Sequence, residues 1–212
     1  MKKILFQGDS ITDCGRDRTN NELIGSGYAC LVKANMMFEY PTEYRFFNRG
    51  INGNRSVDLY ARIKSDIINL QPDYISFLIG VNDVWQEIGS CNGVSAEKYE
   101  KIYCMMLDEI LEALPNVKIM IMEPFCLRGE ATNDTEEHPN KWKIFRTEVE
   151  LRAERARCVA EKYNLPFVEL QKKFDEMAEK TRSENWLWDG VHPTPAGHEL
   201  LKREWLACFE SL

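Results

Sequence analysis

Short apolar runs alternate with longer segments of helical periodicity along the whole chain. Runs of strand length lie at Lys3–Phe6, Tyr44–Phe47, Asp73–Ile79, Val117–Met122 and Pro166–Leu170. Apolar residues three and four positions apart predict helices over Gly25–Glu39, over Ser56–Leu70, between Ser95 and Pro115, over Trp142–Tyr163, and from Thr194 onward. This alternation predicts an α/β fold with a parallel sheet covered by helices on both faces, in the doubly wound strand order 2-1-3-4-5.

The chain has 212 residues, of which 44% are hydrophobic and 29% charged, as in a soluble globular protein. Its length and the lack of repeats or linkers predict one domain over residues 1–212. No apolar run approaches the roughly 20 residues of a membrane helix. Only three apolar residues follow the basic start at Met1–Lys3, so no export signal is expected. We therefore expect a cytoplasmic protein that does not bind membranes.

The formal net charge of −7 disfavours nucleic acid as a partner, because a phosphate backbone requires a basic surface. The seven cysteines include no Cys-x-x-Cys pair, so we expect reduced and mostly buried thiols. The three histidines are far apart in the sequence and indicate no metal site. We expect no metal and no cofactor. The oligomeric state stays open, and a symmetric homo-oligomer is compatible with the sequence.

Small and reactive residues follow each predicted strand, at the edge of a parallel sheet where ligands bind. A serine hydroxyl becomes a nucleophile only when a base takes its proton, and Ser10 follows the first strand. His192 is the natural base because imidazole titrates near neutral pH. Asp189, three residues earlier, can orient that imidazole from the same loop. These three residues are our candidates for a catalytic triad.

An attacked carbonyl also needs preorganised donors for the developing oxyanion. The candidates are the backbone N–H groups of Ser10 and Gly53 and the side-chain amide of Asn82. Each residue also has an ordinary structural interpretation when taken alone: Ser10 as a helix cap, Asn82 as part of a turn, and Gly53 as a loop-shaping glycine. Their joint occurrence at successive strand ends favours the catalytic interpretation.

Four segments resemble the signature blocks of the GDSL-type esterases, in the SGNH hydrolase superfamily. The matching segments are Gly8–Ser10, Asn48–Gly53, Gly80–Asp83 and Asp189–His192, and they occur in the family's order. The resemblance implies a three-layer α/β/α sandwich of flavodoxin-like topology with five parallel strands. It also implies Ser10 as nucleophile, His192 as base and Asp189 as its partner. Ser10, Gly53 and Asn82 would form the oxyanion hole.

Longer matches, including Gly8–Arg16 and Ile79–Trp85, resemble a bacterial branch that contains intracellular acetylxylan esterases. This resemblance implies a hydrolase that removes acetyl or other short acyl groups, with an acetylated saccharide such as a xylo-oligosaccharide as its small-molecule ester substrate. Trp85 and Trp188 lie beside the signature blocks, where an aromatic face packs on a sugar ring or walls an acyl pocket. For Trp85, plain core packing is an equal alternative.

Two rival functions remain from the sequence. A lysophospholipase or thioesterase of the same superfamily would need a long apolar groove, which a sequence does not reveal. A non-catalytic flavodoxin-like binding module would hold phosphate after the first strand, where Asp9 and Asp13 make the loop unsuitably acidic. Residues Arg128–Asn140 are interpreted as a solvated loop rather than a lid. We expect His198 to be structural or to support the catalytic residues indirectly, and not to be a ligand. Glu148 and Arg152 are expected to mark a solvated helix.

Overall fold

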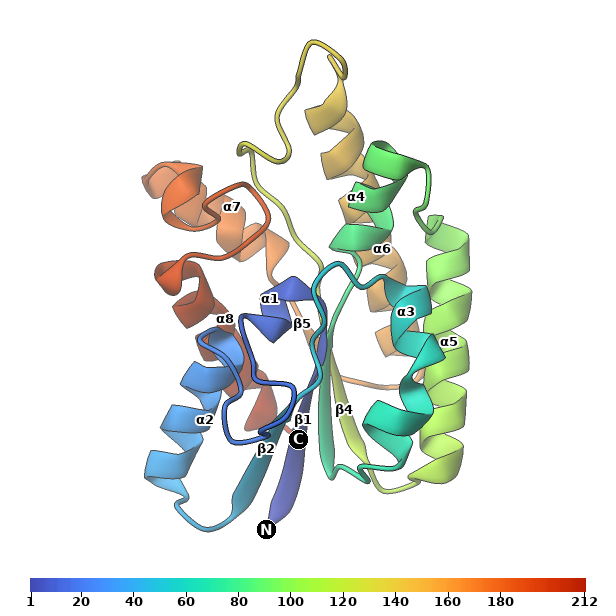
Figure 1. Ribbon diagram of the computed structural model, residues 1–212, viewed down its shortest axis with the longest axis vertical. Coiled ribbons are helices and arrows are strands. Elements are labelled where there is room, and N and C mark those ends of the chain that lie inside the picture. Colours follow the sequence, from blue (N-terminus) through green and yellow to red (C-terminus); the bar gives the residue numbers. More distant parts are fainter.

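Five parallel strands form one sheet in the order β2-β1-β3-β4-β5, and the computed structural model describes all residues, 1–212 (Figure 1). The strands are β1 Lys2–Gly8, β2 Tyr44–Asn48, β3 Tyr74–Leu78, β4 Lys118–Met122 and β5 Phe167–Val168. In the register, Ile4 of β1 lies opposite Phe46 of β2 and Tyr74 of β3. The predicted fold class and strand order are therefore confirmed.

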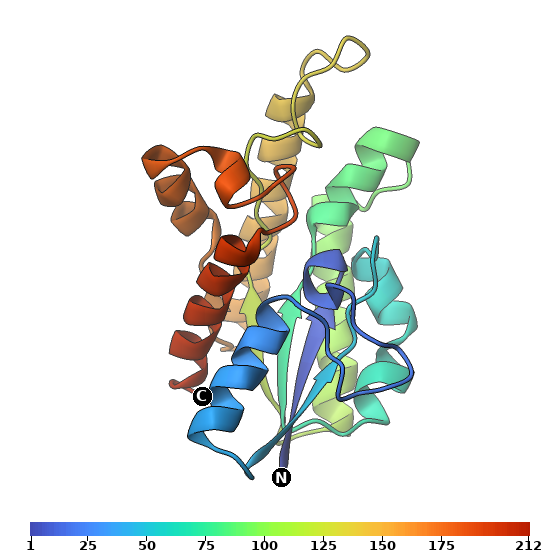
Figure 2. The same cartoon turned by 60° about the vertical axis from the view of Figure 1, so that its left-hand side comes forward.

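Helices cover both faces of this sheet and complete three layers (Figures 1 and 2). Helices α2 and α8 pack together on one face, while α3, α5 and α6 cover the other. The α-helices are α1 Ser10–Asp13, α2 Tyr28–Glu39, α3 Ser56–Ala61, α4 Val81–Ser90, α5 Ala96–Ala113, α6 Lys141–Lys162, α7 Gln171–Lys180 and α8 Pro195–Phe209. A π-helical turn η1 spans Lys64–Ile68, and a 3-10 turn η2 spans Ser183–Asn185. None of the helices combines the length and apolar character that spanning a bilayer requires.

Alternation along the strands divides the core between the two faces. Ile4 and Phe6 of β1 belong to the buried cluster that includes Trp205 of α8, whereas Leu5 belongs to the cluster under α3 and α5. Both faces of the central strand β3 are buried throughout, as its apolar sequence predicts. The sheet is therefore a rigid platform whose strand ends hold the loops at one edge.

The helices predicted from the sequence omit α4, which follows β3 directly. Val81, Val84, Trp85 and Ile88 have the spacing of one helical face, and this signal was available in the sequence. Gly80 adopts φ 140° at the end of β3, and the helix begins at Val81. The consequence is that Asn82 lies in the first turn of a helix and not in a flexible loop.

The predicted helix over Ser56–Leu70 is also wrong in detail, because α3 ends early and η1 follows it. The interruption lies beside Arg62, whose guanidinium donates to the carbonyl oxygens of Arg49 and Gly8 across 2.8 and 3.3 Å. These contacts are made to the end of β1 and to the residue after β2, and local periodicity does not encode them. Ile67 in η1 is nevertheless buried, so the pattern identified the correct face.

Two expectations about buried groups are wrong. Arg152 is only 3% exposed and donates to the carbonyl oxygen of Val94 across 2.6 Å, so its helix face is not solvated. All seven cysteines are free thiols, but Cys126 alone is buried, and Cys91 is exposed.

The predicted helix over Gly25–Glu39 begins only at Tyr28, because Gly25 has the left-handed φ of 93°.

Candidate active site

Ser10 is the first residue of α1, immediately beyond the carboxyl end of β1 (Figure 1). The buried carboxylate of Asp9 caps this short helix by accepting from the N–H of Ile11 across 3.0 Å. The chain therefore turns sharply from strand to helix at a fixed point. Ser10 itself is only partly buried, so its hydroxyl is reachable from solvent.

Ser10, His192 and Asp189 form one hydrogen-bonded chain, although Ser10 lies 182 residues from His192. Ser10 Oγ lies 2.9 Å from His192 Nε2, and His192 Nδ1 lies 2.7 Å from Asp189 Oδ2. An ionised carboxylate only accepts, so Nδ1 carries the proton and Nε2 is free to accept from the Ser10 hydroxyl. The second oxygen, Asp189 Oδ1, accepts from the backbone N–H groups of Val191 and His192 across 2.9 and 2.8 Å.

These contacts shift the titration of the histidine and the aspartate in opposite directions. The hydrogen bond to Asp189 is the main reason that the pKa of His192 is raised above its ordinary value, and burial opposes the increase. Burial alone would raise the pKa of Asp189, but the hydrogen bonds from His192 and Val191 outweigh it and hold that pKa below the ordinary value. Burial also raises the pKa of Asp9 to about 7.

The three candidate oxyanion donors come from three separate strand ends. Within the chain, the N–H groups of Ser10 and Gly53 donate to no acceptor, so both are available to a ligand. The amide Nδ2 of Asn82 donates to the carbonyl oxygen of Asn54 across 3.2 Å, which keeps it beside the Gly53 loop. Gly53 is exposed and has φ 77°, a backbone conformation that residues other than glycine rarely adopt.

Both candidate substrate tryptophans lie against His192. The ring of Trp188 is 57% exposed and stacks on the imidazole, with centroids 5.6 Å apart and planes 20° apart. Trp85 is half-buried between His192 and Phe145, with centroid distances of 5.8 and 6.0 Å. Trp85 therefore combines core packing with a place beside the imidazole, whereas Trp188 presents its face to solvent.

A cavity of about 260 Å³ opens beside the serine. It is lined by Ser10, Ile11, Cys14, Gly15, Asn52, Trp188, His192, Pro193 and His198. Neither Gly53 nor Asn82 lines it. His198 is buried, and its Nδ1 accepts from the N–H of Tyr28 at the start of α2 across 3.1 Å. This contact gives His198 the structural position expected of it.

A buried part of the loop at 128–140 supports the turn that carries Asp189, and the sequence interpretation missed this. Ala131 N–H donates to the carbonyl oxygen of Asp189, and Leu127 N–H to that of Gly190, each across 2.9 Å. Gly129 packs so closely that a Cβ there would lie 2.3 Å from the Asp189 carbonyl carbon. The two glycines, Gly129 and Gly190, were the available signal. Only residues 133–140 are exposed throughout.

The arginines near the site make local contacts. Arg16 donates to the carbonyl oxygen of Gly50 across 2.7 Å, and Arg49 donates to Asn21 across 2.8 Å. Arg55 forms an ion pair with Asp58 across 2.9 Å.

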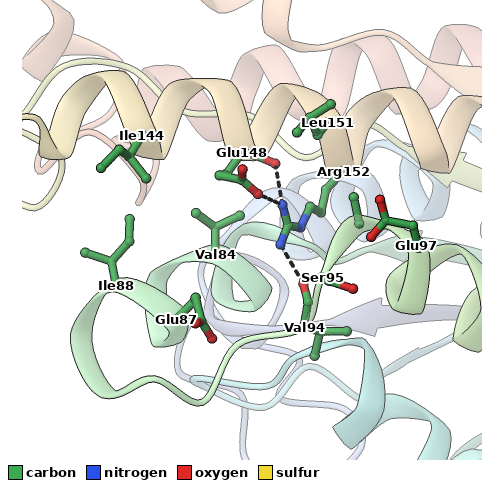
Figure 3. Close-up of a pocket in the computed structure, with 11 residues that line it drawn as sticks. Val84, Glu87, Ile88, Val94, Ser95, Glu97, Ile144, Glu148, Leu151 and Arg152 are labelled. Carbon is green, nitrogen blue, oxygen red and sulfur yellow. Dashed lines mark hydrogen bonds and ion pairs between the residues drawn. The ribbon is translucent and has the colours of Figure 1, made fainter.

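A larger cavity of about 480 Å³ lies between α4, α5 and α6 and contains none of the triad residues (Figure 3). Its apolar walls include Val84, Ile88 and Ile144, and the guanidinium of Arg152 reaches between Glu148 and the Val94 carbonyl. Arg152 is paired with Glu148, and Glu87 accepts from the Gly93 N–H. The one hydroxyl in the lining, Ser95 Oγ, caps α5 by accepting from the Lys98 N–H, and no histidine lines the cavity. No cluster of three or more metal-ligating side chains occurs in the chain.

Comparison with known proteins gives one family match and close structural relatives. The model of the GDSL-like lipase/acylhydrolase family matches residues 6–200. An acetylxylan esterase from Geobacillus stearothermophilus is 35% identical over 97% of this chain and 92% of its own length. A solved structure of a GDSL-like lipase from Parabacteroides merdae has a TM-score of 0.89 at 36% identity and covers 98% of this chain and 94% of that chain. The solved Geobacillus esterase has a TM-score of 0.84 at 33% identity, covering 97% and 93%.

Proposed function

This chain belongs to the GDSL-like lipase/acylhydrolase family and is a carboxylic ester hydrolase, and from that premise we propose that it removes acetyl groups from acetylated xylo-oligosaccharides through an acyl-enzyme on Ser10. The observation that carries the proposal is the 2.9 Å contact between Ser10 Oγ and His192 Nε2. A hydroxyl paired with an oriented imidazole is the arrangement that nucleophilic catalysis needs.

In the first half of the reaction, Ser10 Oγ bonds to the acetyl carbonyl carbon while its proton passes to His192 Nε2. The tetrahedral intermediate then breaks its bond to the sugar oxygen, which takes the proton from Nε2 and leaves as an alcohol. Water attacks the acetyl-serine in the second half and gives a proton to His192. Acetic acid leaves as Ser10 Oγ recovers that proton, and it then ionises to acetate in solution. Asp189 stabilises the imidazolium that forms in both halves.

The negative oxygen of each tetrahedral intermediate needs donors that are already in place. We assign this role to the N–H groups of Ser10 and Gly53 and to the side-chain amide of Asn82. The first two have no partner within the chain, and the third is held beside the Gly53 loop. Donors that are fixed before the reaction require no reorganisation as charge develops.

The preference for a short acyl group rests on the size of the cavity beside Ser10. Its volume of about 260 Å³ lies below the roughly 300–1,000 Å³ of pockets that enclose drug-sized ligands. An acetyl group fits such a space, whereas a long acyl chain would extend beyond it. We assign the exposed ring of Trp188 to contact with the sugar, because aromatic faces pack well on pyranose rings.

The solved mutants of the Geobacillus acetylxylan esterase support these assignments. Its catalytic mutants replace a serine, an aspartate or a histidine. The aspartate and histidine are three positions apart there, as Asp189 and His192 are here. Another mutant replaces the tryptophan just before that aspartate, the place that Trp188 occupies in this chain, and that protein is described as an acetyl-xylooligosaccharide esterase.

The test is acetate release from acetylated xylo-oligosaccharides, with p-nitrophenyl acetate and p-nitrophenyl octanoate assayed in parallel. Ser10→Ala removes the nucleophile, and Ser26→Ala is the matched control, because Ser26 is an exposed serine that does not contact the triad. We expect rapid acetate release that Ser10→Ala abolishes and Ser26→Ala preserves, with octanoate cleaved far more slowly than acetate.

Other outcomes would redirect the assignment. Serine-dependent cleavage of p-nitrophenyl acetate without release from the oligosaccharide would contradict the saccharide substrate. Faster cleavage of octanoate than of acetate would favour a lysophospholipase or thioesterase. Full activity in Ser10→Ala would refute the acyl-enzyme.

A further inference from the structure

The loop over residues 53–56 is hydrogen-bonded to α4 and the turn after it at every position. The first two loop residues accept through their carbonyl oxygens: Gly53 O from Gln86 Nε2 across 2.5 Å, and Asn54 O from Asn82 Nδ2 across 3.2 Å. The next two donate through their side chains: the Arg55 guanidinium to Asn92 O and Ser56 Oγ to Asp83 Oδ1, each across 2.5 Å. Two of these side chains belong to the signature block at Gly80–Asp83. Gln86 lies outside it, one helical turn further along.

The side chain of Gln86 binds Gly53 directly, through the Gly53 carbonyl oxygen. A Cβ built on Gly53 would have a single neighbour within 4 Å, the Nε2 atom of Gln86 at 4.0 Å. Gly53 is exposed, and its own backbone N–H donates to no acceptor within the chain. Because a carbonyl oxygen accepts only from a donor, the amide of Gln86 must point its NH₂ toward Gly53. The orientation of the side chain is thereby determined.

A glycine at this position is otherwise free to rotate. Its φ of 77° lies in a region that glycine leaves readily, since no Cβ restricts its backbone angles. A hydrogen bond to its carbonyl oxygen holds the peptide plane that follows Gly53. The φ and ψ angles of Gly53 connect this held plane to its own N–H, so the N–H can point in fewer directions than in a free glycine. Fixed donors stabilise an oxyanion better than mobile ones, because reorientation costs free energy during the reaction.

We propose that Gln86 is a positioning residue of the esterase, which holds the Gly53 N–H in the direction of the oxyanion by binding the Gly53 carbonyl oxygen. The inference rests on the proposed oxyanion role of Gly53 and adds to it a residue outside the signature blocks. Gln86 is hydrogen-bonded to neither Ser10 nor His192, so in this proposal it acts through Gly53.

The decisive variant is Gln86→Met, which keeps the length and volume of the side chain but has no donor. Both acylation and deacylation pass through an oxyanion, so kcat reports the loss whichever step is slower. We expect kcat for p-nitrophenyl acetate to fall about three- to tenfold, the effect of one neutral hydrogen bond, with KM nearly unchanged. The matched control is Glu87→Gln, which is one residue along α4 and keeps an oxygen acceptor for the Gly93 N–H.

A second variant separates positioning from general stability. Gln86→Arg retains planar N–H donors at the same place and should restore most of the lost kcat. The midpoint of thermal unfolding should be similar in all three variants, because Gln86 is only half-buried. Restoration of kcat by Arg without a change in stability is a result that a purely structural role would not produce.

These assays distinguish failure of the Gln86 inference from failure of the proposed function. Wild-type kcat in Gln86→Met, while Ser10→Ala is inactive, would overturn this inference and leave the proposed function intact. A rise in KM alone would also overturn it, because it would place Gln86 in contact with substrate. Full activity in Ser10→Ala would instead refute the proposed function itself.

Discussion

The backbone N–H of Ala131 donates to the carbonyl oxygen of Asp189 across 2.9 Å, and so joins two segments that are 58 residues apart in the chain. The loop after β4 thereby holds the turn that presents Asp189 to His192. Loops carry functional groups accurately only when a rigid scaffold positions them. Here part of that scaffold is itself a loop, anchored by Gly129, whose missing side chain allows the two backbones to meet.

Gly129→Ala should therefore impair activity without touching any reacting atom. Its Cβ would lie 2.3 Å from the Asp189 carbonyl carbon and from the Gly190 nitrogen, and backbone atoms cannot move aside cheaply. We expect kcat/KM to fall at least tenfold and stability to decrease by about 1–3 kcal/mol. Gly89→Ala is the matched control, since it has open space around it and lies in α4. Equal activity of the two variants in an ester assay would contradict this role of Gly129.

Ser10→Ala and His192→Ala should each remove nearly all turnover, and the double variant should lose little more. The reason is that the hydroxyl and the imidazole act as one unit, so the second deletion removes nothing that the first has left. The measurement is kcat for p-nitrophenyl acetate in the four proteins of the cycle. Losses that multiply in the double variant would mean that the two residues act independently.

The acid limb of the pH–rate profile should report His192. The base must be neutral, and the pKa of His192 is raised by Asp189, so kcat/KM should fall as the pH drops through a value above 6.5. Asp189→Asn removes the main cause of that increase and should move the limb to lower pH. The same change should lower the maximal rate by about 10⁴, through the wrong tautomer. An unchanged limb in Asp189→Asn would assign the titration to another group.

Asn82→Ala should lower kcat by about 10²–10³, the loss measured for single oxyanion donors. Asn92→Ala is a suitable control, because Asn92 is exposed and makes its contacts through its backbone. KM should change little, because the carbonyl of the bound ester needs this donor far less than the oxyanion does. A loss that is confined to KM would place Asn82 in ground-state binding.

His198 should make the fold sensitive to acid. Burial lowers its pKa to about 4 from an ordinary value near 6.5, so the unfolded chain binds a proton at a pH where the folded chain does not. Its contribution to stability is complete above pH 6.5 and is lost as the pH falls toward 4, by up to about 3 kcal/mol. His198→Gln, which can still accept from Tyr28, should lose less stability over that interval in urea unfolding. Parallel losses in both proteins would assign the acid sensitivity elsewhere.

Most of the architecture was predictable because it is encoded locally. The apolar runs of β1 and β3 and the helix starts at Ser95 and Thr194 depend on residues close together in the chain, and in the structure both of these side chains cap their helices. The errors occurred where distant segments decide. The helix is interrupted beside Arg62, which binds the last residue of β1 and the residue after β2, and Arg152 binds the loop at Val94. Periodicity measures which face is apolar and does not report which partner a charged side chain will reach.

The candidate site divides in the same way. The sequence by itself determined the residue types at the strand ends, because parallel strands bring their carboxyl ends to one edge whatever the details of packing. Only the tertiary structure decided that Trp188 stacks on His192, that Gly129 supports Asp189 and that Gln86 binds the Gly53 carbonyl. These contacts join segments separated by loops of irregular backbone, and their geometry depends on the packing of the whole sheet and its helices.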